Sequence, residues 1–282
     1  MRFANLDDRL VMVAGDRAVD VATASQQRFG PDPLAALEKW PELLDWAGSA
    51  PGGDGRPAQP DRFAAPVPRP RQVFALALNY PMHAAEARLE APSDPLVFTK
   101  FPSCLTGPDA TVTLPSDRVD WEVELVVVIG PGGHRIPAER AWAHVAGLTI
   151  GQDLSERSVQ LAGPRPQFSL GKSFPGFGPT GPVLVTRDEL ADPDDLEITC
   201  TLNGTVVQQA RTSDMIFPVP ETIAWISAIC PLSPGDLIFT GTPAGVGHGR
   251  DPRRYLRPGD ELVSSIEGIG EIRTRFAAAP PA

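Results

Sequence analysis

Strand-like hydrophobic patterns dominate the chain from residue 73 onward. Short apolar and β-branched runs separated by Gly, Pro and Asn are typical of β-strands. The runs are VFALAL, LVFTK, ATVTLP, DWEVELVVVIG, AGLTIGQD, PVLVT, LEITCTLNG, DLIFTG and ELVSSIEGIGEIRTRF. Short helices are expected between them at 81–90, 137–145, 155–162 and 220–229. Because these helices are too few and irregular for repeated strand–helix–strand units, the pattern predicts an α+β fold built on a mostly-β mixed sheet.

The first seventy residues show a different pattern of apolar, Pro and Gly positions. Residues 1–22 alternate apolar and polar positions around Gly15-Asp16, which predicts a small hairpin, and residues 33–48 predict a helix interrupted at Pro41. Residues 50–71 are dense in Pro and Gly, which favours a linker over a regular element. We therefore predict a small N-terminal α/β domain with its linker at 1–66 and a second domain at 72–280.

Composition and charge narrow the class of protein. The chain has 282 residues, of which 42% are hydrophobic and 21% charged, so it is globular rather than disordered. Its 25 basic and 35 acidic residues give a net charge of −10, which argues against nucleic-acid and anionic-membrane partners. Three cysteines are too few for a disulfide scaffold, and no apolar leader opens the sequence, so we expect a cytoplasmic protein.

Two glutamates share one face of the strand predicted within 120–130. Glu122 and Glu124 are two positions apart, and continuously apolar residues follow them, which indicates a strand covered on both sides. Two partly buried like charges are costly unless a cation compensates them, and hard divalent cations prefer carboxylate oxygens. Asp153, at the end of AGLTIGQD, would complete an Mg²⁺ or Mn²⁺ site with open positions for water and substrate. The alternative is an edge strand whose glutamates face water.

A histidine and a glutamate lie three positions apart just after the strand VFALAL. Pro81 suits the first turn of a helix, so His83 and Glu86 are expected to be neighbours on one helix face. A carboxylate beside an imidazole orients it and raises its basicity, as a water-activating base requires. The alternative is an ordinary surface pair. Solvated or capping roles are expected for the other histidines, His134, His144 and His248.

Lysine is rare in this chain, since only Lys39, Lys100 and Lys172 occur among the 25 basic residues. Lys172 stands among apolar residues in FSLGKSF, which suggests a counter-charge for a carboxylate or enolate, although a surface lysine is the alternative. The glycine loop 240–247 lacks the spacing of nucleotide-binding motifs. Its backbone amides and threonine hydroxyls could hold a carboxylate, or the loop could be a plain tight turn.

Ordered together, these segments resemble the fumarylacetoacetate hydrolase family. The resemblance runs from about Leu78 to Phe276. The motifs that carry it are LNYPMHAAE, PLVFTKFPSCLTGP, DWEVELVVVIG, AGLTIGQDLSERSVQ, GKSF, GPTGPVLVT, LNGTVVQQARTSDMIF, SPGDLIFTGTPAGVG and GDELVSSIEGIGEI. The resemblance implies a mixed β-roll catalytic domain, usually homodimeric, that binds Mg²⁺ or Mn²⁺.

Site residues follow from the resemblance motif by motif. It implies that Glu122, Glu124 and Asp153 bind the metal, that His83 and Glu86 form the catalytic dyad on a closing segment, and that Lys172 lies near the metal. It places Arg157 and Gln160 at polar positions on the substrate side and Thr242 in the carboxylate-holding loop, and we expect Tyr80 to contact substrate as well.

The implied activity is hydrolysis of a C–C bond in a 2-oxo acid or 1,3-dicarbonyl substrate through a metal-stabilised enolate. An oxaloacetate-type decarboxylase and a keto–enol tautomerase or isomerase would use the same site and stay open as alternatives. A non-enzymatic family member that retains only the fold is the remaining alternative.

Overall fold

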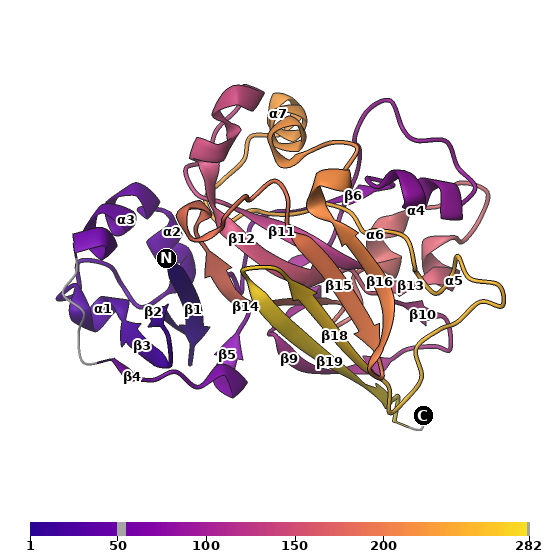
Figure 1. Cartoon of the computed structure of the whole chain (residues 1–282), viewed down its shortest axis with the longest axis horizontal. Helices are drawn as coiled ribbons and strands as arrows, with labels where there is room; N and C mark the ends of the chain where they lie inside the picture. Colours follow the sequence, from indigo (N-terminus) through magenta and orange to yellow (C-terminus); the bar gives the residue numbers. More distant parts are fainter. Residues whose placement is uncertain (50–54, 281–282) are drawn as a thin grey trace.

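Most of the regular structure in this protein is β-sheet (Figure 1). The computed structural model describes residues 1–49 and 55–280. The strands are β1 (Arg2–Leu6), β2 (Arg9–Ala14), β3 (Arg17–Asp20), β4 (Arg56–Pro57), β5 (Phe63–Ala64), β6 (Val73–Ala77), β7 (Leu96–Thr99), β8 (Leu105–Thr106), β9 (Asp109–Leu114), β10 (Val119–Asp120), β11 (Val123–Ile129), β12 (Val145–Gln152), β13 (Ser155–Glu156), β14 (Gly178–Val185), β15 (Glu197–Leu202), β16 (Thr205–Arg211), β17 (Leu237–Phe239), β18 (Glu261–Ile266) and β19 (Gly270–Ala278). The α-helices are α1 (Val21–Ala24), α2 (Pro33–Leu37), α3 (Trp40–Ser49), α4 (Pro81–Glu86), α5 (Arg157–Gln160), α6 (Phe168–Gly171) and α7 (Val219–Ile229). The predicted mostly-β mixed fold is confirmed.

A twelve-stranded sheet runs through the molecule in the order β4-β3-β2-β1-β14-β12-β11-β17-β6-β7, with β5 paired to β1 and β8 to β14. Its N-terminal strands join the rest because β1 pairs antiparallel with β14, where Phe3 lies opposite Leu184. In Figure 1 the N-terminal elements lie to the left of the other sheets, with α2 and α3 above the strands. The division into domains at 1–66 and 72–280 stays a prediction.

A five-stranded sheet, in the order β16-β15-β18-β19-β9, packs against the large sheet through contacts of β15 with β11 and of β18 with β12. The side chains of Val123, Leu125, Val127 and Ile129 on β11 enter the core that also holds Ile198 and Leu202 of β15. This core buries one face of β11, as the apolar run predicted.

The opposite face of β11 changes character along the strand. Val126 and Val128 belong to a second core that includes Phe3 and Trp40, whose rings meet edge to face at 5.2 Å. Glu122 and Glu124 share that face because side chains alternate, but they lie nearer the other end of the strand. The face is therefore apolar under the N-terminal helices and acidic at the beginning of β11.

Local predictions made from an Asn-Gly turn and from helix-like patterns agree with the structure to different extents. Asn203-Gly204 joins β15 to β16 with φ angles of 52° and 76°, as an Asn-Gly hairpin requires. The predicted helices at 81–90 and 220–229 appear as α4 and α7. The predicted helix at 155–162 is only the single turn α5.

Other local predictions need correction. The hairpin at 1–22 is a three-stranded meander, because Asp7 and Asp8 adopt φ near 58° and form an extra turn before the one at Gly15. Pro41 does not break the helix but lies in the first turn of α3, where proline loses no hydrogen bond. The helix predicted at 137–145 is a 3-10 helix, Ala138–His144.

The predicted linker at 50–71 is partly ordered. Residues 50–54 lie outside the described part, and short strands β4 and β5 occupy part of the remainder, where β5 closes onto β1. Within the described part of the chain, none of the helices has the length and apolar character needed to cross a membrane.

Candidate metal centre and active site

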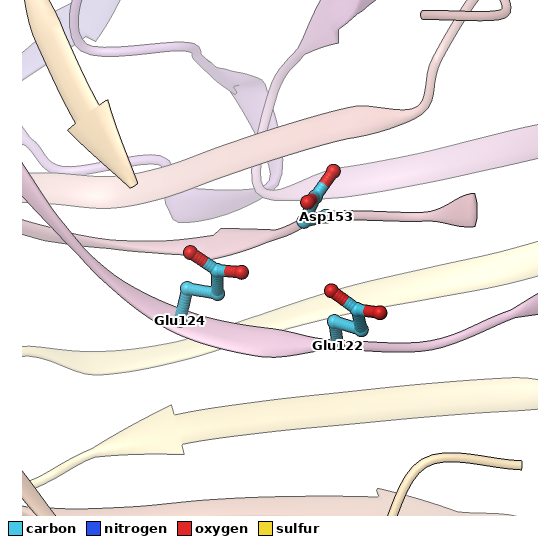
Figure 2. Close-up of side chains that lie close together, drawn as sticks. All are labelled: Glu122, Glu124 and Asp153. Atoms are coloured by element: carbon cyan, nitrogen blue, oxygen red, sulfur yellow. The ribbon is translucent and has the colours of Figure 1, made fainter. Parts of the chain in front are cut away.

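Three buried carboxylates converge at the junction of β11 and β12. Glu122 precedes β11, Glu124 lies on it, and Asp153 follows β12. Each of the three offers one oxygen that lies within 4.8 Å of the others (Figure 2). The exposed fractions of Glu122 and Glu124 are 5% and 1%, so neither glutamate projects from the protein surface into bulk water. β11 is also not an edge strand, because it pairs with β12 and β17.

Strand pairing explains why these groups meet. β11 and β12 are antiparallel neighbours, so the beginning of one lies beside the end of the other, and Val123 pairs with Gln152. The backbone N–H of Asp153 donates to the carbonyl of Glu122 at 2.9 Å, which carries the pairing one step beyond the strands. Carboxylates separated by about thirty positions in sequence thus become adjacent.

Three buried cations surround the acidic cluster. Lys172 Nζ lies 2.6 Å from both Glu122 Oε2 and Asp153 Oδ2. Lys100 Nζ lies 2.6 Å from the other oxygen of Asp153, and Arg157 Nη2 lies 2.7 Å from Glu122 Oε1. The predicted counter-charge role of Lys172 therefore has a structural basis, and its side chain is not at the surface.

The environment divides the glutamates into two kinds. Burial raises the pKa of Glu122, but Lys172 and Arg157 outweigh burial and lower it to about 2. Burial and the nearby carboxylates of Asp153 and Glu122 raise the pKa of Glu124 well above its usual range. The hydrogen bond that Glu124 accepts comes from a backbone amide, since the N–H of Gly241 donates to Oε2 at 2.7 Å. Glu124 is thus the carboxylate with the least compensation.

These residues fit a divalent cation. All three candidate ligands are hard carboxylate oxygens on buried side chains, and three such groups around open positions are the donor set that Mg²⁺ and Mn²⁺ prefer. The poorly compensated charge of Glu124 supports the same assignment, because a cation would remove the repulsion that now raises its pKa.

The predicted dyad lies at the same site. Pro81 begins α4, which places His83 and Glu86 one turn apart with Nδ1 3.3 Å from Glu86 Oε2. Both oxygens of Glu86 also accept from the N–H of Gly245 at 3.1 Å. Gly245 adopts φ +110°, and a Cβ there would collide with the carbonyl oxygen of Val207, so only glycine can present this N–H. The glycine loop therefore orients the dyad.

A cleft of about 650 Å³ opens above the carboxylate cluster. Its lining includes His83, Glu86, Glu122, Arg157, Gln160, Lys172 and Thr242. The structure thus brings most of the predicted catalytic and substrate-side residues to one cavity. Glu124 and Asp153 lie beneath its surface and are not among the described residues that line it.

Tyr80 departs from the prediction of a direct substrate contact. Its exposed fraction is 1%, and its ring packs in the main core rather than lining the cleft. The reason is local, since Tyr80 precedes α4 as its N-cap residue and its extended backbone turns the ring inward. Its buried hydroxyl has no hydrogen-bond partner in the described part of the chain.

Three residues of the site were missed in the sequence. Lys100 bonds Asp153, and the rarity of lysine that drew attention to Lys172 applied equally to Lys100. Asp120 accepts from Arg157 Nε at 2.9 Å and from the N–H groups of Gly247 and His248, so it ties the strand to the glycine loop. His248 was expected to be solvated or capping, but it lines the cleft because this loop folds over the site.

Comparison with known proteins agrees with this architecture. The family model described as "Fumarylacetoacetate (FAA) hydrolase C-terminal" matches residues 72–277, and this chain belongs to the fumarylacetoacetate hydrolase family. It is 47% identical over 212 residues to the mitochondrial oxaloacetate tautomerase FAHD2A of Bos taurus, an alignment that covers 74% of this chain and 68% of that protein.

Solved structures give the same result over the whole chain. A protein from Mycobacterium smegmatis that bears the provisional name HpcE is 56% identical, with a TM-score of 0.95 and coverage of 99% of this chain and 100% of the other. Maleylpyruvate hydrolase from Sphingobium sp. SYK-6, solved with manganese(II) and pyruvate, is 29% identical with a TM-score of 0.82 and the same coverage.

Proposed function

We propose that this chain is a divalent-metal-dependent enzyme that hydrolyses a C–C bond in 2-oxo acids carrying a second carbonyl group. The observation that carries the proposal is the convergence of Glu122, Glu124 and Asp153 beneath the cleft that the His83–Glu86 dyad also lines. The manganese and pyruvate named for the Sphingobium maleylpyruvate hydrolase structure support both the metal and the substrate class.

Glu122, Glu124 and Asp153 would hold Mg²⁺ or Mn²⁺. Bound there, the cation would supply Lewis-acid stabilisation of negative charge on the substrate oxygens. Lys172, an ammonium at the base of the cleft, would share the charge that develops on the 2-oxo oxygen. Arg157 and Gln160, bonded to each other at 2.8 Å, would position the substrate on the adjoining wall.

Hydrolysis would begin with proton transfer from water to the dyad. His83, oriented by Glu86, takes a proton from water while the water oxygen bonds to the distal carbonyl carbon. The bond from that carbon to the methylene carbon breaks, and its electron pair passes to the methylene carbon as an enolate. The proton held by His83 then goes to the methylene carbon. One acylpyruvate and one water thus give one carboxylic acid and one pyruvate.

Keto–enol tautomerisation is a second candidate, favoured by the 47% identity to the oxaloacetate tautomerase of Bos taurus. It requires only that a proton pass between the methylene carbon and the enol oxygen, without attack by water. The same enolate stabilisation at Lys172 would serve both reactions.

An assay of metal-loaded protein with acylpyruvates distinguishes hydrolysis from tautomerisation. Loss of enol absorbance with equal release of pyruvate indicates hydrolysis, whereas loss of absorbance without pyruvate indicates tautomerisation. For hydrolysis, His83→Ala should lower kcat at least about 100-fold, and exposed His134→Ala serves as the matched control. Absence of pyruvate release with both Mg²⁺ and Mn²⁺ would reject the proposed hydrolysis, and absence of both reactions would reject the second candidate as well.

We also propose a cytoplasmic homodimer. Cys104, Cys200 and Cys230 are free thiols, which fits a reducing compartment, although the related FAHD2A protein is named as mitochondrial. Light scattering on the purified chain tests the dimer, and a monomer at all concentrations would reject it.

A further inference from the structure

The charges at the base of the cleft nearly balance without substrate. Four buried carboxylates, Asp120, Glu122, Glu124 and Asp153, face three buried cations, Lys100, Arg157 and Lys172. Each cation already bonds at least one of these carboxylates. A divalent cation would leave one excess positive charge, which a single substrate carboxylate neutralises. A second carboxylate would find no free counter-charge there.

The outer wall of the cleft is apolar. Its side chains come from the segment after α4, from β7 and from the α5–α6 region, and they include Leu89, Leu96, Val97, Phe98, Leu161 and Phe168. Four of them are more than one-third exposed: Leu89 56%, Leu96 47%, Leu161 42% and Val97 39%. Exposed apolar side chains gathered around a cleft mark a surface that an apolar ligand covers.

The histidine of the glycine loop does not offer this wall a positive charge, and the two cations of the cleft lining, Arg157 and Lys172, already bond carboxylates. His248 lines the cleft, and its Nδ1 lies 2.9 Å from the hydroxyl of Tyr255. Burial, with the cations Arg157 and Arg253 nearby, lowers the pKa of His248, which disfavours a positive charge on its ring. The carboxylate of Glu86, which also lines the cleft, would repel an anion.

Two exposed arginines adjoin the wall in sequence. Arg88 precedes Leu89, and Arg165 precedes the lining residue Pro166. Neither is among the described residues that line the cleft. A distal carboxylate could still be attracted from solution through exposed arginines such as these, so both belong in the test.

We propose that the cleft selects 2-oxo acids with one carboxylate and an uncharged, apolar distal acyl group over dicarboxylates of the same length. This selectivity rests on the proposed function, because the 2-oxo acid end must occupy the metal site for the distal group to reach the wall. Each CH₂ buried on the wall then strengthens binding, whereas a terminal carboxylate must be desolvated without a partner.

Matched pairs of substrates test the selectivity. Straight-chain acylpyruvates of increasing length are compared with their ω-carboxylated counterparts, and with oxaloacetate, at saturating Mn²⁺. We expect kcat/KM to rise about fourfold per CH₂ over the first few carbons, and each ω-carboxylated member to be at least about tenfold poorer than its partner. Equal or better turnover of the dicarboxylates would overturn the selectivity and leave the proposed function intact. If no 2-oxo acid reacts, the proposed function fails instead.

Variants of the wall locate the effect. Leu161→Arg places a cation on an exposed lining position. It should reduce the ratio of kcat/KM for an acylpyruvate to kcat/KM for its ω-carboxylated partner at least about fivefold, whereas the neutral control Leu161→Gln should not favour dicarboxylates. An unchanged preference in Leu161→Arg would overturn the assignment of this wall to the distal group. Arg88→Ala and Arg165→Ala should leave the preference unchanged. If kcat/KM falls only for dicarboxylates in either variant, the proposal is contradicted, since these arginines would then recruit a second carboxylate.

Discussion

Lys100 Nζ lies 2.6 Å from Asp153 Oδ1, and both side chains are fully buried. The same ammonium donates to the carbonyl of Phe177 at 3.2 Å and to the main-chain carbonyl of Lys172. Lys100 thereby links the carboxylate of Asp153 to the main chain of Lys172. Because it does not line the cleft, its role is to position Asp153 and Lys172 rather than to touch substrate.

Lys100→Met should destabilise the protein by about 3–5 kcal/mol, since removing one partner of a buried ion pair leaves the other poorly compensated. Urea unfolding of the metal-free protein measures this loss. Exposed Lys39→Met is the matched control and should stay within about 0.5 kcal/mol of wild type. A Lys100→Met protein as stable as the control would show that Asp153 does not depend on this ammonium.

Glu124→Gln should separate stability from metal binding. The amide keeps the shape and can still accept from the N–H of Gly241, but it removes a buried negative charge beside Asp153 and Glu122. We expect the unfolding free energy of the metal-free variant to equal that of wild type or to exceed it by up to about 2 kcal/mol. Its affinity for Mn²⁺ should fall at least about 100-fold.

Calorimetric titration with Mn²⁺ and urea unfolding of the same preparations provide the two measurements. Glu197→Gln, a change at an exposed strand residue, is the control and should alter neither. Wild-type Mn²⁺ affinity in Glu124→Gln would remove Glu124 from the ligand set.

The acidic cluster was predictable because its members carry local signals. Glu122 and Glu124 reveal a shared face through period-two spacing, and Asp153 ends a strand-like run. Their convergence required the antiparallel pairing of β11 with β12, which the pattern of apolar residues does not specify. The family resemblance supplied that missing step.

The errors have a common physical origin. Tyr80, Asp120 and His248 have roles set by how the glycine loop and α4 fold over the strands, and no periodicity records such contacts. The extra turn at Asp7 and Asp8 was missed because two consecutive non-glycine residues adopt positive φ, which composition signals weakly. Long-range pairing and unusual backbone conformations are therefore what the sequence left unresolved.

Asp20, which lies in the N-terminal part of the chain, should make the free energy of unfolding depend on pH. Its hydrogen-bonded ion pair with Arg9, at 2.6 Å, lowers the pKa of Asp20 from 3.8 to about 2. Because the folded-state pKa is depressed, the ion pair stabilises fully above pH 3.8 and loses its effect as pH falls toward 2. Partial solvent exposure limits the contribution to about 1 kcal/mol.

Asp20→Asn tests this dependence, since asparagine retains the N-cap of α1 and removes only the charge. The difference in unfolding free energy between wild type and variant should be about 1 kcal/mol at pH 6 and smaller at pH 3. Exposed Asp16→Asn should show no such trend. A difference that grows on acidification would have the wrong sign.

Glu86→Gln should lower turnover without weakening substrate binding. Glu86 faces the imidazole of His83 at 3.3 Å and is itself fixed by the N–H of Gly245. Glutamine can retain the bond to Gly245, but it removes the negative charge that would stabilise the imidazolium formed when His83 takes a proton from water. We expect kcat to fall about 10- to 100-fold with KM nearly unchanged, because Glu86 acts through His83 rather than by holding the substrate.

Two measurements distinguish this positioning role from general damage. Mn²⁺ affinity should be unaffected, since Glu86 is separate from the three carboxylates of the cluster. Exposed Glu90→Gln, just beyond the same short helix, should retain wild-type kcat. If Glu86→Gln raises KM and leaves kcat intact, Glu86 binds substrate directly, and the assignment of His83 as the oriented base must be abandoned.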